Sequence, residues 1–286
     1  MIECNNLVKI YKTKEIEVLA LQGLDLQVAS GEMVAIIGNS GSGKSTLLNM
    51  IGGLDKPSAG RLFVNGKDLF KMSDHDLVKY KRQDVGFIWQ NNARNLIPYL
   101  NALENVELPM LINGKVNRKY AKELLEVVGL GKKMKNRLFE LSGGEQQRVA
   151  IAISLANKPK VLLADEPTGA VDTSTAAVVI DAFRKVNKAY GTTVVIVTHD
   201  RWIASGVDRV IEIRDGRTSS EFIRKSDTNA ADQSEGQYFA SHEKYVVMDA
   251  AGRLQIPAEI MELAQINERT NVKVRYENGA IIITRK

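Results

Sequence analysis

A glycine-rich segment between an apolar run and a second apolar stretch constrains this chain more than any other feature. Met33–Ile37 reads as a buried strand, and it is followed directly by Gly38-Asn39-Ser40-Gly41-Ser42-Gly43-Lys44-Ser45 and then by Thr46-Leu47-Leu48. In the pattern G-x-x-x-x-G-K-[ST], glycines let backbone N–H groups turn toward phosphate oxygens, and the next helix N-terminus adds positive potential. Lys44 would reach the β- and γ-phosphates, and Ser45 would offer a hydroxyl to Mg²⁺. The alternative is a flexible Gly/Ser turn, but the strand and helix on either side favour nucleotide binding.

The rest of the first 224 residues fits an α/β fold with a largely parallel sheet. Short β-branched runs alternate with longer amphipathic segments from Leu7 to about Arg224. Val161–Ala164 and Val194–Val197 are apolar throughout, which is typical of strands buried on both faces.

Composition excludes several classes of protein. The chain has 286 residues, 44% hydrophobic content and a single cysteine, so no internal disulfide can form and a reducing cytoplasm fits. No apolar run approaches the roughly 18 residues of a membrane span, and Met1–Asn6 lacks the features of a secretory leader. The net charge of +5 permits an anionic partner without requiring one. We expect a soluble chain whose membrane role, if it has one, comes through a partner.

Two carboxylates and one histidine follow the buried strands. Asp165 and Glu166 come directly after Val161–Ala164, where Asp165 would hold Mg²⁺ and Glu166 would polarise an attacking water. His199 follows the strand at Val194–Val197 and could contact the γ-phosphate and that water. Asp-Glu-Pro can also simply end a strand, and a lone histidine is often structural. The phosphate loop in the same chain favours the catalytic interpretation.

Leu141-Ser142-Gly143-Gly144-Glu145-Gln146-Gln147-Arg148 reads locally as a capping box, in which Ser142 caps a helix and Glu145 reaches back. Such a helix N-terminus also presents free N–H groups to an anion. Here the sequence resembles the ABC ATPases, whose Leu-Ser-Gly-Gly motif lies between the phosphate loop and the acidic pair, as in this chain. The resemblance covers about Met1 to Arg224. It implies a RecA-like core with an antiparallel β subdomain and a helical subdomain.

The resemblance also implies roles for individual residues. Tyr11 matches the aromatic residue that stacks on adenine, and Gln90 matches the glutamine that touches Mg²⁺ and senses the membrane partner. Asp172 matches a loop that crosses a dimer interface, and His199 matches the switch histidine. In this family two ATPase domains pack head to tail, with each ATP between one phosphate loop and the other subunit's signature. A single set of motifs therefore implies a homodimer that closes on ATP and Mg²⁺.

The finer resemblance is to the macrolide-efflux and lipoprotein-release branch, of MacB and LolD type. It is carried by three segments: Gly52–Gly60, Ala102–Pro109 and Ala164–Ala170. Members pair with a separate permease of FtsX/MacB type, which would place this chain on the inner face of the cell membrane. Asn91–Asn95 departs from the usual apolar link after the glutamine, and this region commonly meets the membrane partner.

The chain divides by composition into an ATPase domain at 1–224, a linker at 225–242 and a C-terminal domain at 243–286. The linker is rich in Ser, Asp, Asn, Ala, Gln and Gly. In the C-terminal domain Pro257 marks a possible helix start, and Asn278-Gly279 predicts a hairpin between Val272–Tyr276 and Ala280–Thr284.

Val247–Pro257 resembles the start of an AbrB/SpoVT-type swapped-hairpin domain, which implies dimerisation and, in many members, DNA binding. Seven basic and six acidic residues at 243–286 make a weak electrostatic footprint for a duplex. We therefore favour a dimerisation role. A soluble ABC ATPase with a DNA-binding regulatory C-terminal domain remains the alternative.

Overall fold

The structure is a computed structural model. It describes residues 1–12, 16–90, 95–169, 171–225, 239, 241–249, 251–266 and 271–285. Most of the expected linker, four of the five residues at 91–95 and Ala170 lie outside the described residues.

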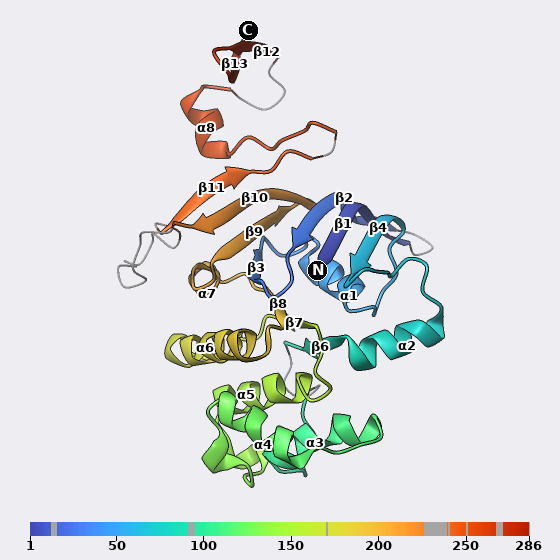
Figure 1. Ribbon diagram of the computed structural model, residues 1–286. Helices are drawn as coiled ribbons and strands as arrows, with labels where there is room; N and C mark the ends of the chain where they lie inside the picture. The colour runs from blue at the N-terminus through green and yellow to red at the C-terminus, as the bar shows by residue number, and fades with distance from the viewer. Residues whose placement is uncertain are drawn as a thin grey trace.

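A seven-stranded sheet forms the centre of the molecule, in the order β11-β10-β9-β3-β8-β7-β6 (Figure 1). Its strands are β3 (Met33–Ile37), β6 (Val85–Ile88), β7 (Val161–Asp165), β8 (Thr193–Val197), β9 (Arg209–Arg214), β10 (Arg217–Arg224) and β11 (His242–Val246). The strands from β6 to β9 run parallel, whereas β10 and β11 are antiparallel additions at one edge. The expectation of an α/β fold with a largely parallel sheet is confirmed.

A smaller antiparallel sheet packs against one face of the central sheet. Its order is β2-β1-β4-β5, with β1 (Ile2–Lys12), β2 (Glu17–Val28), β4 (Ala59–Val64) and β5 (Lys67–Asp68). Helix α1 (Lys44–Ile51) supplies Leu47, Leu48 and Met50 to the core that joins the two sheets. The phosphate loop therefore enters a helix that is buried between two layers.

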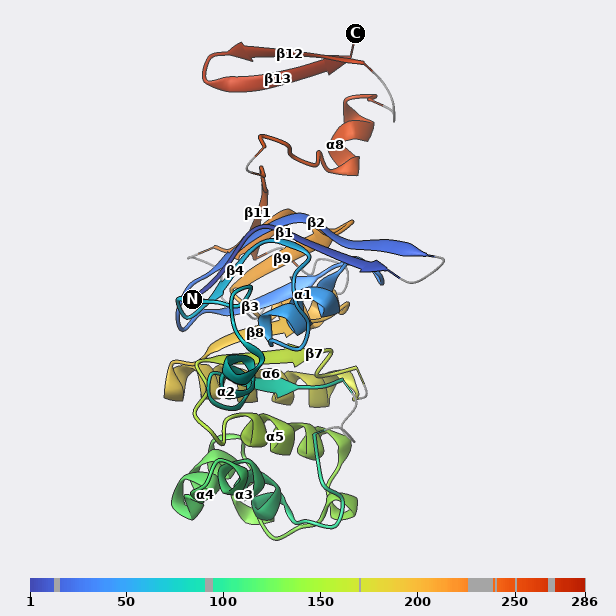
Figure 2. The same ribbon diagram turned by 90° about the vertical axis from the view of Figure 1, so that its right-hand side faces the viewer.

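Helices cover the other face, as Figure 2 shows most clearly. They are α3 (Ala102–Ile112), α4 (Arg118–Val127), α5 (Gly143–Ser154), α6 (Thr173–Tyr190) and the short α7 (Arg201–Ser205), with 3₁₀ turns at Gly131–Lys133 and Leu138–Glu140. Helix α2 (Asp74–Gln83) packs instead on the α1 side, where Tyr80 is buried in the core between the two sheets. Strand β7 shows how the two cores are separated: Leu162 and Ala164 pack with α3 to α6, while Val161 and Leu163 pack with α1. Alternate side chains of a strand point to opposite faces, so a strand buried on both sides must be apolar throughout.

The C-terminal residues begin as part of the central sheet. Strand β11 returns beside β10, with Arg224 opposite His242 and Ser220 opposite Val246. Beyond it lie α8 (Ala258–Leu263), β12 (Val272–Glu277) and β13 (Ala280–Arg285), at the end of the molecule opposite α3 and α4 (Figures 1 and 2). Pro257 does precede the helix, and Asn278 and Gly279 have the positive φ values of the expected hairpin turn. Across the described residues, no helix has the length and apolar character needed to cross a bilayer.

Candidate active site

The phosphate loop owes its path to glycines. Gly38, Gly41 and Gly43 have φ values of 157°, 79° and 99°. A Cβ atom at Gly38 would lie 2.3 Å from the carbonyl oxygen of Ile213, and one at Gly43 would lie 2.6 Å from that of Ala20. Only glycine fits such a close approach of backbone to backbone. Neighbouring strands thus hold the loop in shape before any ligand binds.

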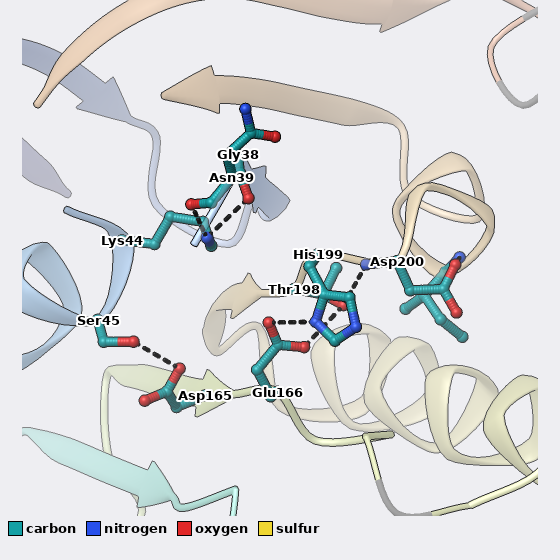
Figure 3. Close-up of polar contacts among 10 residues, drawn as sticks. Gly38, Asn39, Lys44, Ser45, Asp165, Glu166, Thr198, His199 and Asp200 are labelled. Carbon is teal, nitrogen blue, oxygen red and sulfur yellow. Dashed lines mark hydrogen bonds and ion pairs between the residues drawn. The ribbon is translucent and has the colours of Figure 1, made fainter. Parts of the chain in front are cut away.

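Lys44 lies beneath the loop that it helps to shape. Its Nζ atom donates to the carbonyl oxygens of Gly38, at 2.8 Å, and Asn39, at 3.0 Å (Figure 3). Burial lowers the pKa of Lys44, and the charges of Glu166 and Asp165 oppose that shift. The ammonium group is therefore a fixed positive charge at the base of the cleft. Bound phosphate groups would give it an anionic partner that compensates for its burial.

A cleft of about 510 Å³ opens over the loop. It is lined by Tyr11, Val18, Leu19, Ala20, Ser40, Gly41, Ser42, Gly43, Lys44, Ser45, Thr46, Gln90, Glu166 and His199. Within the part of the chain that the structure describes, the Ser42 hydroxyl is buried without a hydrogen-bond partner. An orphaned hydroxyl group beside a buried ammonium group fits a phosphate oxygen, because a buried polar group without a partner is otherwise unfavourable.

The expected metal ligands meet at the floor of this cleft. The Ser45 hydroxyl donates to Asp165 Oδ1 at 3.2 Å (Figure 3), and Gln90 lines the same cleft. Burial raises the pKa of Asp165, and the nearby charge of Glu166 adds to that effect. The described residues include no group of three or more His, Cys, Asp or Glu that could hold a metal ion. Oxygen ligands of this kind, completed by nucleotide phosphates and water, are those that Mg²⁺ accepts, so the residues fit it.

Glu166 is held in an unusual backbone conformation that aims its carboxylate at the cleft. Its φ is 47°, in the left-handed region, and its N–H donates to the carbonyl oxygen of Val197 at 2.9 Å. Glu166 Oε1 lies 2.8 Å from His199 Nδ1, and the Thr198 hydroxyl donates to Oε2 at 3.2 Å (Figure 3). Left-handed conformations of non-glycine residues are strained and cluster at functional sites. These contacts fix the orientation of the carboxylate at the cleft.

Thr198 is a site residue that sequence reasoning missed. Besides contacting Glu166, its hydroxyl accepts from the Asp200 N–H at 3.1 Å. Asp200 in turn caps α7 through Trp202 and Ile203. The signal was present in the sequence, since Thr198 and His199 share the end of one strand, but a threonine in that place has many structural roles.

Tyr11 lies at the edge of the cleft, 39% exposed. Its hydroxyl donates to Asp55 Oδ2 at 2.7 Å, and Lys9 Nζ lies 4.8 Å from the ring centroid. Lys9 is itself paired with Asp55 at 2.5 Å. A ring fixed in this way and open to solvent fits a stacking platform for a base.

The residues of the Leu-Ser-Gly-Gly signature, Leu141 to Gly144, are not among the residues that line the cleft. The Ser142 side chain accepts from the Glu145 N–H, and the Glu145 side chain accepts from the Ser142 N–H, so the capping box is confirmed. Ser142 and Gly143 are exposed, while Gly144 is buried against Thr175. Among the described residues that line the cleft, Ser142, Gly143, Gly144 and Asp172 are absent. Asp172 instead caps α6, and hydrogen bonds from Ser174 and Thr175 lower its pKa. One chain thus carries two separate groups of the expected residues.

Comparison with known proteins identifies the family. The sequence profile described as ABC transporter matches residues 21–169. The chain belongs to the ABC transporter family. An uncharacterised ABC transporter ATP-binding protein of Thermotoga maritima is 48% identical over 212 residues, which are 73% of this chain and 89% of that protein. LolD, the ATP-binding protein of the lipoprotein-releasing system of Xanthomonas oryzae pv. oryzae, is 45% identical over 220 residues, which are 76% of this chain and 89% of LolD.

Solved structures agree with this assignment. The ATP-binding cassette MJ0796 of Methanocaldococcus jannaschii, in a dimeric post-hydrolysis state bound to ADP and Pi, is 42% identical, with a TM-score of 0.69. The match covers 77% of this chain and 97% of that one. CbiO1 of Clostridium perfringens is 29% identical with the same TM-score and covers 76% of this chain and 86% of its own. This ABC transporter ATP-binding subunit is therefore an ATP hydrolase, and the α/β fold is that of the family.

Proposed function

We propose that two copies of this chain pack head to tail around two ATP molecules and drive a separate membrane permease. The separation of the two residue groups supports this proposal most directly. Lys44, Ser45 and Glu166 line one cleft, and Asp165 accepts from Ser45 there, whereas Ser142 is exposed at the start of α5 outside it. A second copy can bring its Ser142 to the nucleotide of the first, which a single chain does not do.

In this proposal each residue of the cleft has one task. The loop N–H groups, Lys44 and the Ser42 hydroxyl bind the phosphates, and Tyr11 stacks on adenine. Ser45, Asp165 and Gln90 hold Mg²⁺, which neutralises phosphate charge when it is bound. Glu166 accepts a proton from the attacking water, and His199 orients the carboxylate and the water. The partner's signature completes the site, so hydrolysis and closure of the dimer are coupled.

Crosslinking tests the arrangement, because Cys4 is buried and is the only native cysteine. Ser40 and Ser142 are both exposed, so a cysteine at either position is accessible to the reagent. In a Glu166→Gln background that carries S40C and S142C, a short bismaleimide should link two chains only when ATP is added. Each single-cysteine chain is the control. If the double-cysteine chain gives no ATP-dependent dimer, the head-to-tail arrangement is wrong.

We further propose the LolD-like role, with a permease of FtsX/MacB type at the inner face of the membrane. The support is the 45% identity to LolD over 89% of its length. Co-purification of the tagged chain from membranes tests this, and recovery of a permease of another type would contradict it.

The C-terminal residues, from about 243, are proposed to dimerise as a swapped-hairpin domain of AbrB type. In the hairpin, Val274 pairs with Ile283 and Tyr276 with Ile281. Directly opposed residues share a face, and on this face Val274 is 61% and Tyr276 is 77% exposed. A two-stranded hairpin with an uncovered apolar face is marginally stable alone, and a second copy would cover it.

Light scattering on the nucleotide-free chain tests this proposed dimerisation through the hairpin. Val274→Glu should shift the dimer toward monomer, whereas Lys273→Glu, on the opposite face of β12, should leave the mass unchanged. Equal masses for the native chain and Val274→Glu would refute dimerisation through this face of the hairpin. Salt-dependent binding of duplex DNA that Lys273→Glu abolishes would instead favour the DNA-binding alternative.

A further inference from the structure

The turn between β9 and β10 touches the phosphate loop directly. The Gly216 N–H donates to the carbonyl oxygen of Ser42 at 3.1 Å, and the Gly216 carbonyl accepts from the Gln22 N–H at 3.0 Å. Asp215 and Gly216 have φ values of 47° and 69°, as in a two-residue hairpin turn. A Cβ atom at Gly216 would lie 2.7 Å from the carbonyl oxygen of Ala20. The turn is therefore wedged between β2 and the loop.

The next residue of the same hairpin contacts the C-terminal segment. Arg217 Nη1 lies 3.3 Å from Asp249 Oδ2, and the Val247 N–H donates to the Ser219 carbonyl at 3.0 Å. A cavity of about 410 Å³ lies beside this contact, lined by Arg214, Asp215, Arg217, Asp249, Arg253 and Leu254 among others. The ion pair thus forms one wall of a space shared by the ATPase core and the C-terminal segment.

Asp249 also organises the turn that it belongs to. Its Oδ1 accepts from the N–H groups of Ala251, at 3.0 Å, and Arg253, at 2.9 Å, while Arg253 Nε lies 2.7 Å from Oδ2. The side chain of Asp249 is only 16% exposed. The pairing of β11 with β10 and the bond between His242 Nε2 and the Val207 carbonyl, at 2.8 Å, fasten this segment to the core.

We propose that the C-terminal segment sets the affinity of the phosphate loop for ATP through Asp249 and Arg217. Asp249 is a positioning residue: it holds Arg217, which fixes the Asp215-Gly216 turn, which in turn holds the Ser42 carbonyl. The buried Ser42 hydroxyl, which lacks a protein partner among the described residues, belongs to the same residue. Any partner or second copy that shifts the 249–253 turn would thereby change nucleotide affinity, which is a coupling between two distant parts of the chain.

The test measures binding of a fluorescent ATP analogue to the full chain, together with KM and kcat. Asp249→Asn keeps an oxygen for the N–H groups of Ala251 and Arg253 but loses the charge that holds Arg217. We expect Asp249→Asn and Arg217→Ala each to weaken binding about three-fold, the size of a partly exposed ion pair. The double variant should be no weaker than either single one, and kcat should be unchanged. Arg217→Lys, which keeps the charge, should bind almost normally.

The control is Glu277→Gln, which removes an exposed ion pair with Arg275, at 3.6 Å, on strand β12. It should leave ATP affinity unchanged. The proposal is overturned if Asp249→Asn binds ATP as the native chain does, or if the effects of the two single variants multiply in the double variant. A fall in kcat at unchanged affinity would equally contradict it.

Discussion

Substitution of Glu166 by glutamine separates ATP binding from hydrolysis. Glutamine has the same shape, so its amide oxygen can accept from the Thr198 hydroxyl and its NH₂ group can donate to His199 Nδ1. These contacts lie at 3.2 and 2.8 Å in the native chain. The positive φ of 47° at this position is unchanged by the substitution, so the strain is the same. Fold and ATP affinity should therefore be preserved.

The loss falls on the proton transfer. An amide cannot accept the proton of the attacking water, and a general base contributes about 100- to 10,000-fold. This range corresponds to about 2.7 to 5.4 kcal/mol of barrier, at 1.36 kcal/mol per factor of ten. The rate of phosphate release in a single turnover, with the chain in excess over ATP, should fall by that factor, while the Kd for ATP stays within two-fold (an estimate from the isosteric replacement).

Glu123→Gln is the matched control, because Glu123 is a carboxylate whose partner, the Tyr190 hydroxyl at 3.0 Å, lies outside the cleft. It should hydrolyse ATP at the native rate. Phosphate release by Glu166→Gln within about three-fold of the native rate would refute Glu166 as the base, since a general base typically contributes about 100-fold or more.

Three further predictions concern helix α5, which carries the signature, and the Tyr11 ring, which is proposed to stack on adenine. Gly144→Ala should destabilise the chain by about 1–3 kcal/mol in urea unfolding, because its Cβ atom would lie 2.0 Å from Thr175 Cγ2. Glu145→Gln keeps the capping box but loses the pair with Lys133. The hydrogen bond from Lys133 holds the pKa of Glu145 below its ordinary value. The native chain should therefore lose stability as the pH falls through the acid range and this carboxylate is protonated, and the variant should lose less, as measured by unfolding between about pH 3 and about 6. Tyr11→Ala should weaken ATP binding about ten-fold while Tyr11→Phe binds normally, and equal affinities of the two variants would exclude stacking.

Several local features were predictable because short-range rules decide them. The capping box at Ser142 depends on residues three apart, and the hairpin turn at Asn278-Gly279 depends on two residues that accept positive φ. The strand, glycine loop and helix around Lys44 are likewise contiguous. The buried strands were visible because both faces of a central parallel sheet require apolar side chains.

The contacts that assemble the site come from residues far apart in the chain. The bond between Thr198 and Glu166 spans 32 residues, and the Ser45–Asp165 bond spans 120. These pairs meet because β7 and β8 are neighbours in the sheet order and end on the same side as β3. A one-dimensional pattern names the strands but not their neighbours in the sheet.

In the C-terminal segment, too, some features were predictable from the sequence and others were not. Sequence alone indicated a change of composition after Arg224 and a hairpin near the end. The return of β11 to the edge of the central sheet, and the placement of Asp249 beside Arg217, were decided only by the tertiary structure. Residues 220 to 224 pair with 242 to 246 because β10 offers an unpaired backbone edge. No local propensity of the sequence predicts which strand will pair with this edge of β10.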